Sequence, residues 1–139
     1  MGYLPGELEE KYAPYLEPFD GVFKKVFGYS HYELLKKRAT IAAKPLGFMR
    51  GATFDNAIVL VDECQNMTEK EFRLLLTRVG EHTKVIFSGD SRQVDIPDSG
   101  LESTIERLKY IPEVETVEFM SQDIVRSRLC RDIIMAYER

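Results

Sequence analysis

The chain has 139 residues, with 19 lysines and arginines against 23 aspartates and glutamates, so its formal net charge is −4. A chain of this length buries roughly 70% of the surface that its unfolded form exposes, which is enough for a hydrophobic core. This charge excludes a strongly basic nucleic-acid module but permits a local basic patch. No run approaches the ~18 apolar residues of a membrane span, and two cysteines cannot form a disulfide framework. The acidic N-terminal stretch also lacks the pattern of a signal peptide. We therefore expect one cytoplasmic domain without a membrane partner.

The first 39 residues predict a helical N-terminal segment of that domain. Apolar residues recur there at helical spacing, at Tyr12, Tyr15, Phe19, Phe23 and Val26. Pro14 and Pro18 predict a short helix followed by a longer one. Ser30 and Glu33 have the spacing of a capping box, which predicts a further helix through about Arg38. We interpret the aromatic stripe as core rather than as a ligand site.

Residues 40–139 predict strands that alternate with helices, the pattern of an α/β fold built from βαβ units. The expected strands are residues 57–61, 84–88 and 115–119. The first is a continuous apolar run, typical of a strand buried on both faces of a parallel sheet. Helices are expected to begin after Thr68, where a capping box precedes a helix ending at Gly80, and after Ser99. A last helix is expected around Leu129.

Two acids, Asp62 and Glu63, directly follow the first expected strand. Open parallel sheets bind ligands at the carboxyl ends of their strands. There Asp62 can hold Mg²⁺, directly or through water, and Glu63 can orient or deprotonate an attacking water. A strand that simply ends in a polar loop has the same pattern, so the two acids alone do not define a site.

A second polar group follows the second expected strand. Gln65 and Asn66 come just after the acids, and Asp90 and Gln93 come just after residues 84–88. An aspartate and a glutamine at the end of the neighbouring strand can reach a phosphate or the attacking water. The motifs Asp-Glu-x-Gln and Gly-Asp-x-x-Gln follow successive strands. Their occurrence together is therefore a more specific indication of a functional site than either motif alone.

Six sequence blocks closely resemble the PhoH-like proteins, which are RecA-like P-loop ATPases related to superfamily-one helicases. The blocks are residues 2–8 (GYLPGEL), 45–51 (PLGFMRG), 62–66 (DECQN), 76–80 (LTRVG), 88–95 (SGDSRQVD) and 123–126 (DIVR). They cover essentially the whole chain in the family's order, so the resemblance is specific. It implies a RecA-like parallel sheet with flanking helices, ATP and Mg²⁺ as cofactors, and helicase-like or RNA-linked roles.

The resemblance also implies a role for each polar residue at the strand ends. Asp62 would be the acid associated with Mg²⁺, and Glu63 would be the base that activates water. Gln93 would sense the γ-phosphate, with Asp90 and Gln65 beside it in the nucleotide site.

Basic residues form a second class of candidates. By the same resemblance, Arg50 and Arg126 are the cations for a phosphate or for a neighbouring subunit's nucleotide, and a surface salt bridge is the alternative for each. A basic patch for RNA or another single-stranded nucleic acid is predicted at Lys36, Lys37, Arg38 and Lys44, with Lys24 and Lys25 nearby. A solvated helix face is its alternative.

The sequence departs from the family in one respect, because no GxxxxGK[ST] loop occurs in the 139 residues. The backbone N–H cradle and the lysine that hold the β- and γ-phosphates are therefore missing from them. In the implied strand order, the P-loop strand lies between residues 84–88 and 115–119. Without it, the fold is incomplete and an apolar edge is open to pairing. We expect the isolated chain to form homo-oligomers, to require a P-loop-bearing fragment or upstream segment, or to rearrange.

Three functions are compatible with these observations. The first is the water-activating and γ-phosphate-sensing half of an ATPase, inactive as an isolated chain. The second is a non-catalytic interaction or assembly module derived from such an ATPase, with a partner surface among the N-terminal aromatics. The third is a metal-dependent nuclease that uses Asp62, Glu63, Asp90 and Asp95. The glutamines and the strand order favour the ATPase.

Overall fold

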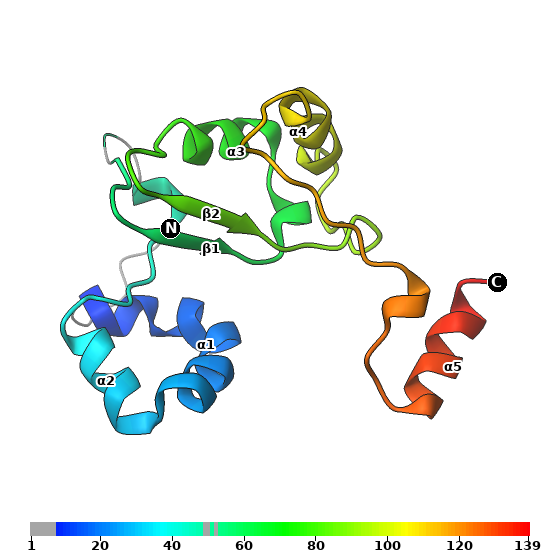
Figure 1. Ribbon diagram of the computed structural model, residues 1–139, viewed down its shortest axis with the longest axis horizontal. Helices are drawn as coiled ribbons and strands as arrows, with labels where there is room; N and C mark the ends of the chain where they lie inside the picture. The colour runs from blue at the N-terminus through cyan, green and yellow to red at the C-terminus, as the bar shows by residue number, and fades with distance from the viewer. Residues whose placement is uncertain (1–7, 49–50, 52) are drawn as a thin grey trace.

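The computed structural model describes residues 8–48, 51 and 53–139, and these residues form a mixed helix and strand structure compatible with an α/β fold. The α-helices are α1 (Leu8–Phe27), α2 (Tyr29–Lys37), α3 (Glu69–Leu76), α4 (Leu101–Leu108) and α5 (Arg128–Tyr137). The strands are β1 (Ile58–Val61) and β2 (Lys84–Phe87), and short 3₁₀ turns are η1 (Leu46–Phe48), η2 (Cys64–Asn66) and η3 (Ser121–Asp123). Figure 1 shows α3 and α4 on one side of the sheet, the α1–α2 pair on the other, and α5 at the far end. No helix in the described residues is long and apolar enough to cross a membrane.

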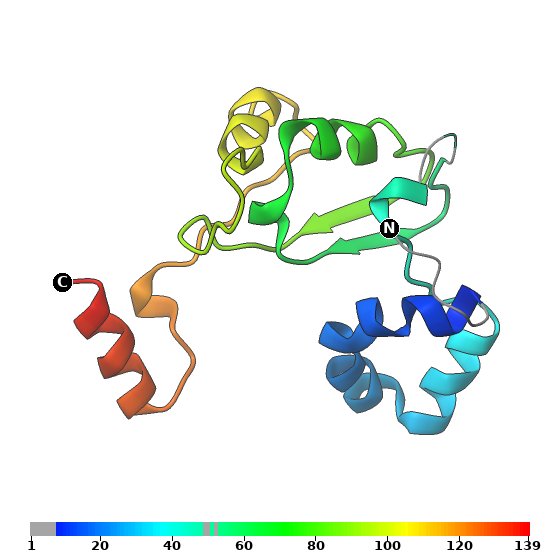
Figure 2. The same ribbon diagram turned by 180° about the vertical axis from the view of Figure 1, so that it is seen from behind.

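The N-terminal segment is a pair of helices held together by aromatic rings. α1 runs through Pro14 and Pro18 as one helix, so the prediction of two helices there was wrong. Both views show this helix bent, which is the usual effect of proline (Figures 1 and 2). The rings of Phe19 and Phe23 stack with centroids 6.1 Å apart, and Tyr32 of α2 lies 5.5 Å from Phe23. These rings hold the C-terminal half of α1 against α2.

The helix expected after Ser30 is present, but its start differs from the prediction. α2 begins at Tyr29, two residues before the expected first helical residue, and its N-cap is Gly28 at φ 78°, so the expected capping box is not the cap. Gly28 tolerates this left-handed backbone because it has no Cβ. Of the predicted apolar stripe, Val26 is exposed, whereas the side chains of Tyr12 and Tyr15 lie outside those described. The stripe is therefore only partly core.

β1 and β2 form a parallel two-stranded sheet, as predicted. The register pairs Ile58 with Lys84 and Val61 with Phe87. One face of the sheet packs on α3, where Phe72 lies 5.2 Å from Phe87 between ring centroids. The buried cluster on this side is Cys64, Met67, Phe72 and Leu75. This cluster thus lies between α3 and one face of the sheet, and Tyr32 is buried separately against Phe23 of α1.

The opposite face of the sheet is open, so the prediction that residues 57–61 are buried on both faces was wrong. Ile58 is 70% exposed, and Leu60 and Ile86 are exposed beside it. Period-two alternation places these side chains away from α3. The α1–α2 pair lies on this side of the sheet (Figure 1), but it does not bury them.

The third predicted strand, residues 115–119, is not a strand. The segment is irregular chain between α4 and η3, with Val117 and Phe119 largely exposed. A strand needs a neighbour to pair with its backbone N–H and C=O groups. No segment among residues 8–48, 51 and 53–139 provides that neighbour for residues 115–119.

The remaining helices start largely as the sequence predicts. Thr68 and Glu71 form the predicted capping box of α3, with the Glu71 N–H donating to Thr68 Oγ1 at 3.2 Å. That helix ends at Leu76, before the predicted stop at Gly80, whose N–H donates to the Phe54 carbonyl at 2.7 Å. Gly100 caps α4, and Ser127 caps α5 through its side chain. The capping box places α3 directly after the loop that follows β1.

Candidate functional site

The loops that follow β1 and β2 lie next to each other at the carboxyl edge of the sheet. Backbone hydrogen bonds continue past the strand ends, from the Ser88 N–H to the Val61 carbonyl at 2.8 Å and from the Cys64 N–H to the Ser88 carbonyl at 2.9 Å. Asp62 and Glu63 lie between these bonds and are exposed. The two predicted acids are therefore held on a paired backbone with their carboxylates open to solvent.

Glu63 has an unusual backbone conformation. Its φ of 53° and ψ of 37° place it in the left-handed region, which disfavours a side chain with a Cβ by about 1–2 kcal/mol. This residue turns the chain from β1 into η2. Strained residues cluster at functional sites, but Ala39, Asn56 and His82 also have positive φ in turns and bends of this chain. The conformation of Glu63 therefore supports a site here without defining one.

Gln65 joins the two loops from inside the protein. It is 1% exposed. Its Nε2 donates to the Glu63 carboxylate and to the Gln93 carbonyl at 3.4 Å, and its Oε1 accepts from the Asp90 N–H at 3.1 Å. The sequence placed Gln65 in the nucleotide-binding set. In this arrangement both ends of its amide are engaged by protein atoms, so it acts by holding the predicted site residues together.

Gly89 allows the two loops to approach this closely. A Cβ at residue 89 would lie 2.7 Å from Gln65 Oε1 and 2.8 Å from Cys64 Sγ. Contacts below 3.0 Å are too short for carbon, so a larger residue would push the loops apart. The close packing of the two loops thus explains why glycine occupies this position of the Gly-Asp-x-x-Gln motif. The sequence alone did not reveal this.

Asp90 organises the loop after β2. Its Oδ1 accepts from the N–H of Arg92 at 2.9 Å and from Arg92 Nε at 3.2 Å, and its Oδ2 accepts from Gln93 Nε2 at 3.0 Å. Bonds from the backbone and side chain of Arg92, and from Gln93, lower the pKa of Asp90 below its ordinary value. The aspartate is therefore a carboxylate at neutral pH, and it holds the exposed side chain of Gln93 at the edge of the site.

Arg92 and Glu138 belong to the same network and were missed by the sequence analysis. Arg92 Nη1 donates to the Glu138 carboxylate, which also accepts from the Ser121 hydroxyl. A cleft of about 350 Å³ lies between this loop and α5, lined by Asp90, Arg92, Gln93, Ile133, Ile134, Tyr137 and Glu138. Arg92 lies inside the recognised motif, but its partner is 46 residues further along the chain. No local sequence signal connects the two.

The predicted arginines do not join this cluster. Arg126 is exposed on the bend before α5, and within the described part of the chain no hydrogen bond or ion pair links it to the strand-end loops. Arg50 lies outside the described residues. A role for either arginine therefore still rests on the family resemblance.

The predicted basic patch lies on and just after α2, away from the strand ends. Lys36 pairs with Glu33 at 2.8 Å and lies over the Tyr32 ring, 4.5 Å from its centroid. Lys37, Arg38 and Lys44 are exposed. Lys36 is thus already engaged in a local ion pair, whereas its three neighbours are available to a polyanion.

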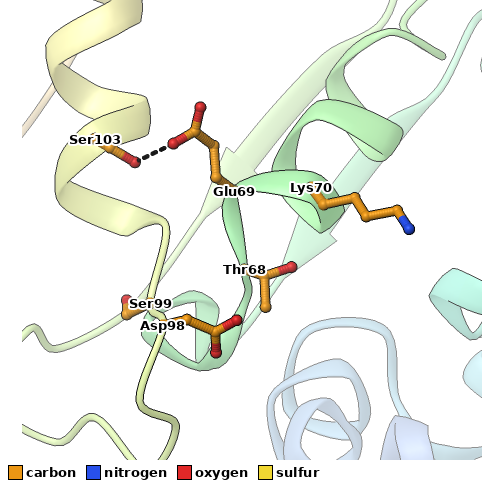
Figure 3. A pocket seen from close by; sticks show the side chains of 6 residues that line it. All are labelled: Thr68, Glu69, Lys70, Asp98, Ser99 and Ser103. Atoms are coloured by element: carbon orange, nitrogen blue, oxygen red, sulfur yellow. Dashed lines mark hydrogen bonds between the residues drawn. The ribbon is translucent and has the colours of Figure 1, made fainter.

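A second hollow, of about 480 Å³, lies where α3 and α4 begin (Figure 3). It is lined by Thr68, Glu69, Lys70, Asp98, Ser99 and Ser103, none of which is a predicted site residue. The Ser103 hydroxyl donates to Glu69 at 3.0 Å, and the Gly100 N–H donates to the Met67 carbonyl at 2.8 Å. In Figure 3, Lys70 points away from the other five side chains. These bonds fasten the start of α4 to the start of α3.

The acids proposed for a two-metal nuclease do not gather. Within the described residues, no three His, Cys, Asp or Glu side chains lie close enough to hold a metal ion together. Asp95 is fixed instead through its backbone N–H, which donates to Asn66 Oδ1 at 2.8 Å. The described residues therefore give the nuclease alternative no support.

The structure defines a mixed α/β protein whose candidate site lies at the carboxyl ends of two adjacent parallel strands. A family model described as PhoH-like protein matches residues 1–138, and the chain belongs to this family. Its sequence is 42% identical over 142 residues to the PhoH-like protein of Bacillus subtilis (strain 168), covering 100% of this chain and 44% of that protein. It is 40% identical over 142 residues to Protein PhoH of Escherichia coli (strain K12), covering 99% of this chain and 40% of that protein. The chain thus spans about two fifths of the length of these curated relatives. The predicted family is confirmed.

Proposed function

We propose that this chain supplies the water-activating and γ-phosphate-sensing side of an ATP site. The observation that carries this proposal is the buried amide of Gln65, which joins Glu63, Asp90 and Gln93 in one hydrogen-bonded cluster at the carboxyl edge of the sheet. Membership of the PhoH-like family supports it through the ATPase chemistry that the resemblance implies.

The cluster suggests a distinct task for each side chain. Asp62 has an exposed carboxylate and belongs to no cluster of three metal-ligating side chains in the described residues. This arrangement is compatible with a Mg²⁺ ion that is coordinated mainly by phosphate oxygens and water. The bound MgATP would supply the electrophilic γ-phosphoryl group. Glu63 is exposed beside Asp62, where it would take a proton from water or orient it. The Gln93 amide would exchange its bond to Asp90 for a γ-phosphate oxygen.

The proposal requires a phosphate-binding loop from outside these 139 residues, because they contain no GxxxxGK[ST] sequence. A P-loop-bearing segment or polypeptide is therefore the first partner that we propose. A second copy of the chain is another, since the open sheet face invites association. Arg126 and Arg50 would then be candidates for a cation supplied across a subunit boundary, and the basic patch on α2 a candidate contact for single-stranded RNA.

Mixing the chain with a P-loop-bearing fragment of a PhoH-like relative tests this proposal. We expect the mixture to hydrolyse MgATP, and Glu63→Gln to lower the turnover by about 10²–10⁴-fold while nucleotide binding persists. Glu102→Gln, which neutralises an exposed acid on α4, is the matched control and should leave turnover unchanged. If the wild-type mixture shows no turnover, the ATPase proposal is wrong.

A non-catalytic assembly module is a second candidate, and the open apolar face favours it. Ile58, Leu60 and Ile86 are exposed together on a single face of the sheet, where water contacts them at a free-energy cost. This function predicts self-association or partner binding without nucleotide affinity. Titration calorimetry of MgATP into the mixture and into the fragment alone separates the two candidates, because only the ATPase half predicts tighter binding in the mixture than in the fragment alone.

A further inference from the structure

The candidate site is connected to the C-terminal helix by a continuous series of hydrogen bonds. Gln93 Nε2 donates to Asp90 Oδ2 at 3.0 Å, and Arg92 Nε donates to Asp90 Oδ1 at 3.2 Å. The same guanidinium donates through Nη1 to Glu138, the residue that caps the end of α5. Arg92 therefore binds two carboxylates, that of Asp90 in the loop after β2 and that of Glu138 at the C-terminal end of α5.

Within the described part of the chain, α5 has few other means of attachment. It is 10 residues long, and a helix of this length is marginal in water on its own. Several of its apolar side chains face solvent, with Leu129 and Tyr137 among the most exposed. Among residues 8–48, 51 and 53–139, the side chains lining the 350 Å³ cleft hold α5, together with the bonds that Glu138 accepts from Arg92 and Ser121. A modest change in these contacts is therefore expected to shift whether α5 is docked.

We propose that Arg92 is a positioning residue that couples the docking of α5 to the placement of Asp90 and Gln93. With α5 docked, Glu138 accepts a hydrogen bond from Nη1 of Arg92, and Arg92 Nε donates to Asp90. Asp90 in turn accepts from the side chain of Gln93. With α5 released, Arg92 keeps its bond to Asp90 but loses its bond to Glu138. The loop after β2 is then no longer attached to α5 through Arg92. The consequence for turnover rests on the proposed ATPase function, whereas the coupling itself does not.

Nuclear magnetic resonance of the full chain tests the coupling without nucleotide. Backbone amide exchange in α5 reports docking, and the side-chain NH₂ resonance of Gln93 reports its placement. In Arg92→Gln and in Glu138→Gln, we expect α5 amides to exchange about two- to five-fold faster, as suits an exposed ion pair, and the Gln93 resonance to shift. Arg107→Gln breaks another exposed pair, with Glu69 at 2.8 Å on the α3–α4 side, and should change neither signal.

Whether Glu138→Gln speeds or slows amide exchange in α5 distinguishes a loss of docking from a change in the stability of the helix itself. A negative charge at a helix C-terminus opposes the helix dipole, so neutralising Glu138 would by itself slow exchange in α5. Faster exchange therefore reports lost docking. The double variant should exchange no faster than Arg92→Gln alone, because both single changes remove one shared interaction. Unchanged exchange, or faster exchange with an unmoved Gln93 resonance, would overturn the proposal.

Turnover measurements in the mixture with the P-loop fragment give a second readout. We expect Arg92→Gln and Glu138→Gln to lower kcat about two- to five-fold with KM for MgATP nearly unchanged, because a misplaced γ-phosphate sensor weakens the transition state more than ground-state binding. Arg107→Gln should alter neither constant. An unchanged kcat in both site variants overturns the positioning role. If the wild-type mixture is inactive, the proposed function fails, and the Gln93 resonance still decides the coupling.

Discussion

The side-chain oxygen of Gln65 accepts a hydrogen bond from the backbone N–H of Asp90 at 3.1 Å, between the two loops at the carboxyl edge of the sheet. Because Gln65 is buried, water cannot readily replace this bond if it breaks. The loop after β1 and the loop after β2 are therefore held as one unit. Such a link is what Glu63 and Gln93 require if they are to act on the same substrate.

Replacing Gln65 with leucine tests the strength of this link. The change leaves the Asp90 N–H without its partner, so we expect the free energy of unfolding to fall by about 1–3 kcal/mol. Urea denaturation followed by circular dichroism measures it. Gln122→Leu makes the same substitution at an exposed position in η3 and should change stability by less than about 0.5 kcal/mol. Equal stability of the two variants would argue against a structural role for Gln65.

Gly89→Ala should destabilise the protein, although alanine is a small residue. The added Cβ would lie 2.7 Å from Gln65 Oε1, so the loops must separate, at a cost of about 1–3 kcal/mol. Gly21→Ala in α1 is the matched control, because a Cβ there meets nothing within 4 Å. A helix-interior glycine replaced by alanine should gain about 0.5–1 kcal/mol. Thermal unfolding of both variants should give shifts of opposite sign.

The Asp90 carboxylate should make the stability of the protein depend on pH in the acid range. Hydrogen bonds from Arg92 and Gln93 hold the pKa of Asp90 below its ordinary value of 3.8. The unfolded state therefore takes up the proton first as pH falls. The stabilisation is full above the ordinary pKa and is lost as pH drops through the folded value.

Comparing the wild type with Asp90→Asn isolates this effect. The variant should be less stable at pH 7, and the difference in the free energy of unfolding should shrink as pH falls from 5 towards about 2. Asp98→Asn removes an exposed carboxylate outside this network and should show a smaller difference at pH 7. A gap between wild type and Asp90→Asn that stays constant with pH would contradict the assigned hydrogen bonds.

Cys64 and Cys130 should differ in reactivity towards thiol reagents. Burial raises the pKa of the Cys64 thiol and also blocks access to it, because the thiolate is the reactive form. In native protein at pH 8, we expect Cys130 on α5 to react first. Cys64 should react at a comparable rate only in denaturing urea. Mass spectrometry of Cys64→Ala and Cys130→Ser variants assigns each rate, and fast native labelling of Cys64 would show that the core opens readily.

The signals that predicted structure correctly from sequence are local ones. The apolar run before Asp62 predicted β1, and the Thr68–Glu71 spacing predicted the capping box that starts α3. The capping box depends on neighbours within a few residues, so the local sequence contains its cause, whereas β1 also required β2 as its pairing partner. The Asp-Glu and Gly-Asp-x-x-Gln motifs were found in the same way, and parallel pairing of β1 with β2 explains why they meet.

Where the sequence analysis failed, distant residues decided the outcome. Residues 115–119 have the composition of a strand, but no segment that the structure describes pairs with their backbone, so they do not form one. α1 continues through Pro14 and Pro18 as one helix, and beyond them its Phe23 packs on Tyr32 of α2. A pattern of residue types describes what a segment can form, and it does not say whether another segment is present to pair with it.

The amino-acid pattern was sufficient to predict the family, β1, β2 and the polar motifs that follow these strands. The folded arrangement was needed to show that Gln65 is a buried link between the loops, that Gly89 permits their close approach, and that Arg92 reaches Glu138 at the end of α5. The physical reason is that these relationships join residues far apart in the chain. They depend on distances that arise only after β1 and β2 have paired and the core has packed against α3.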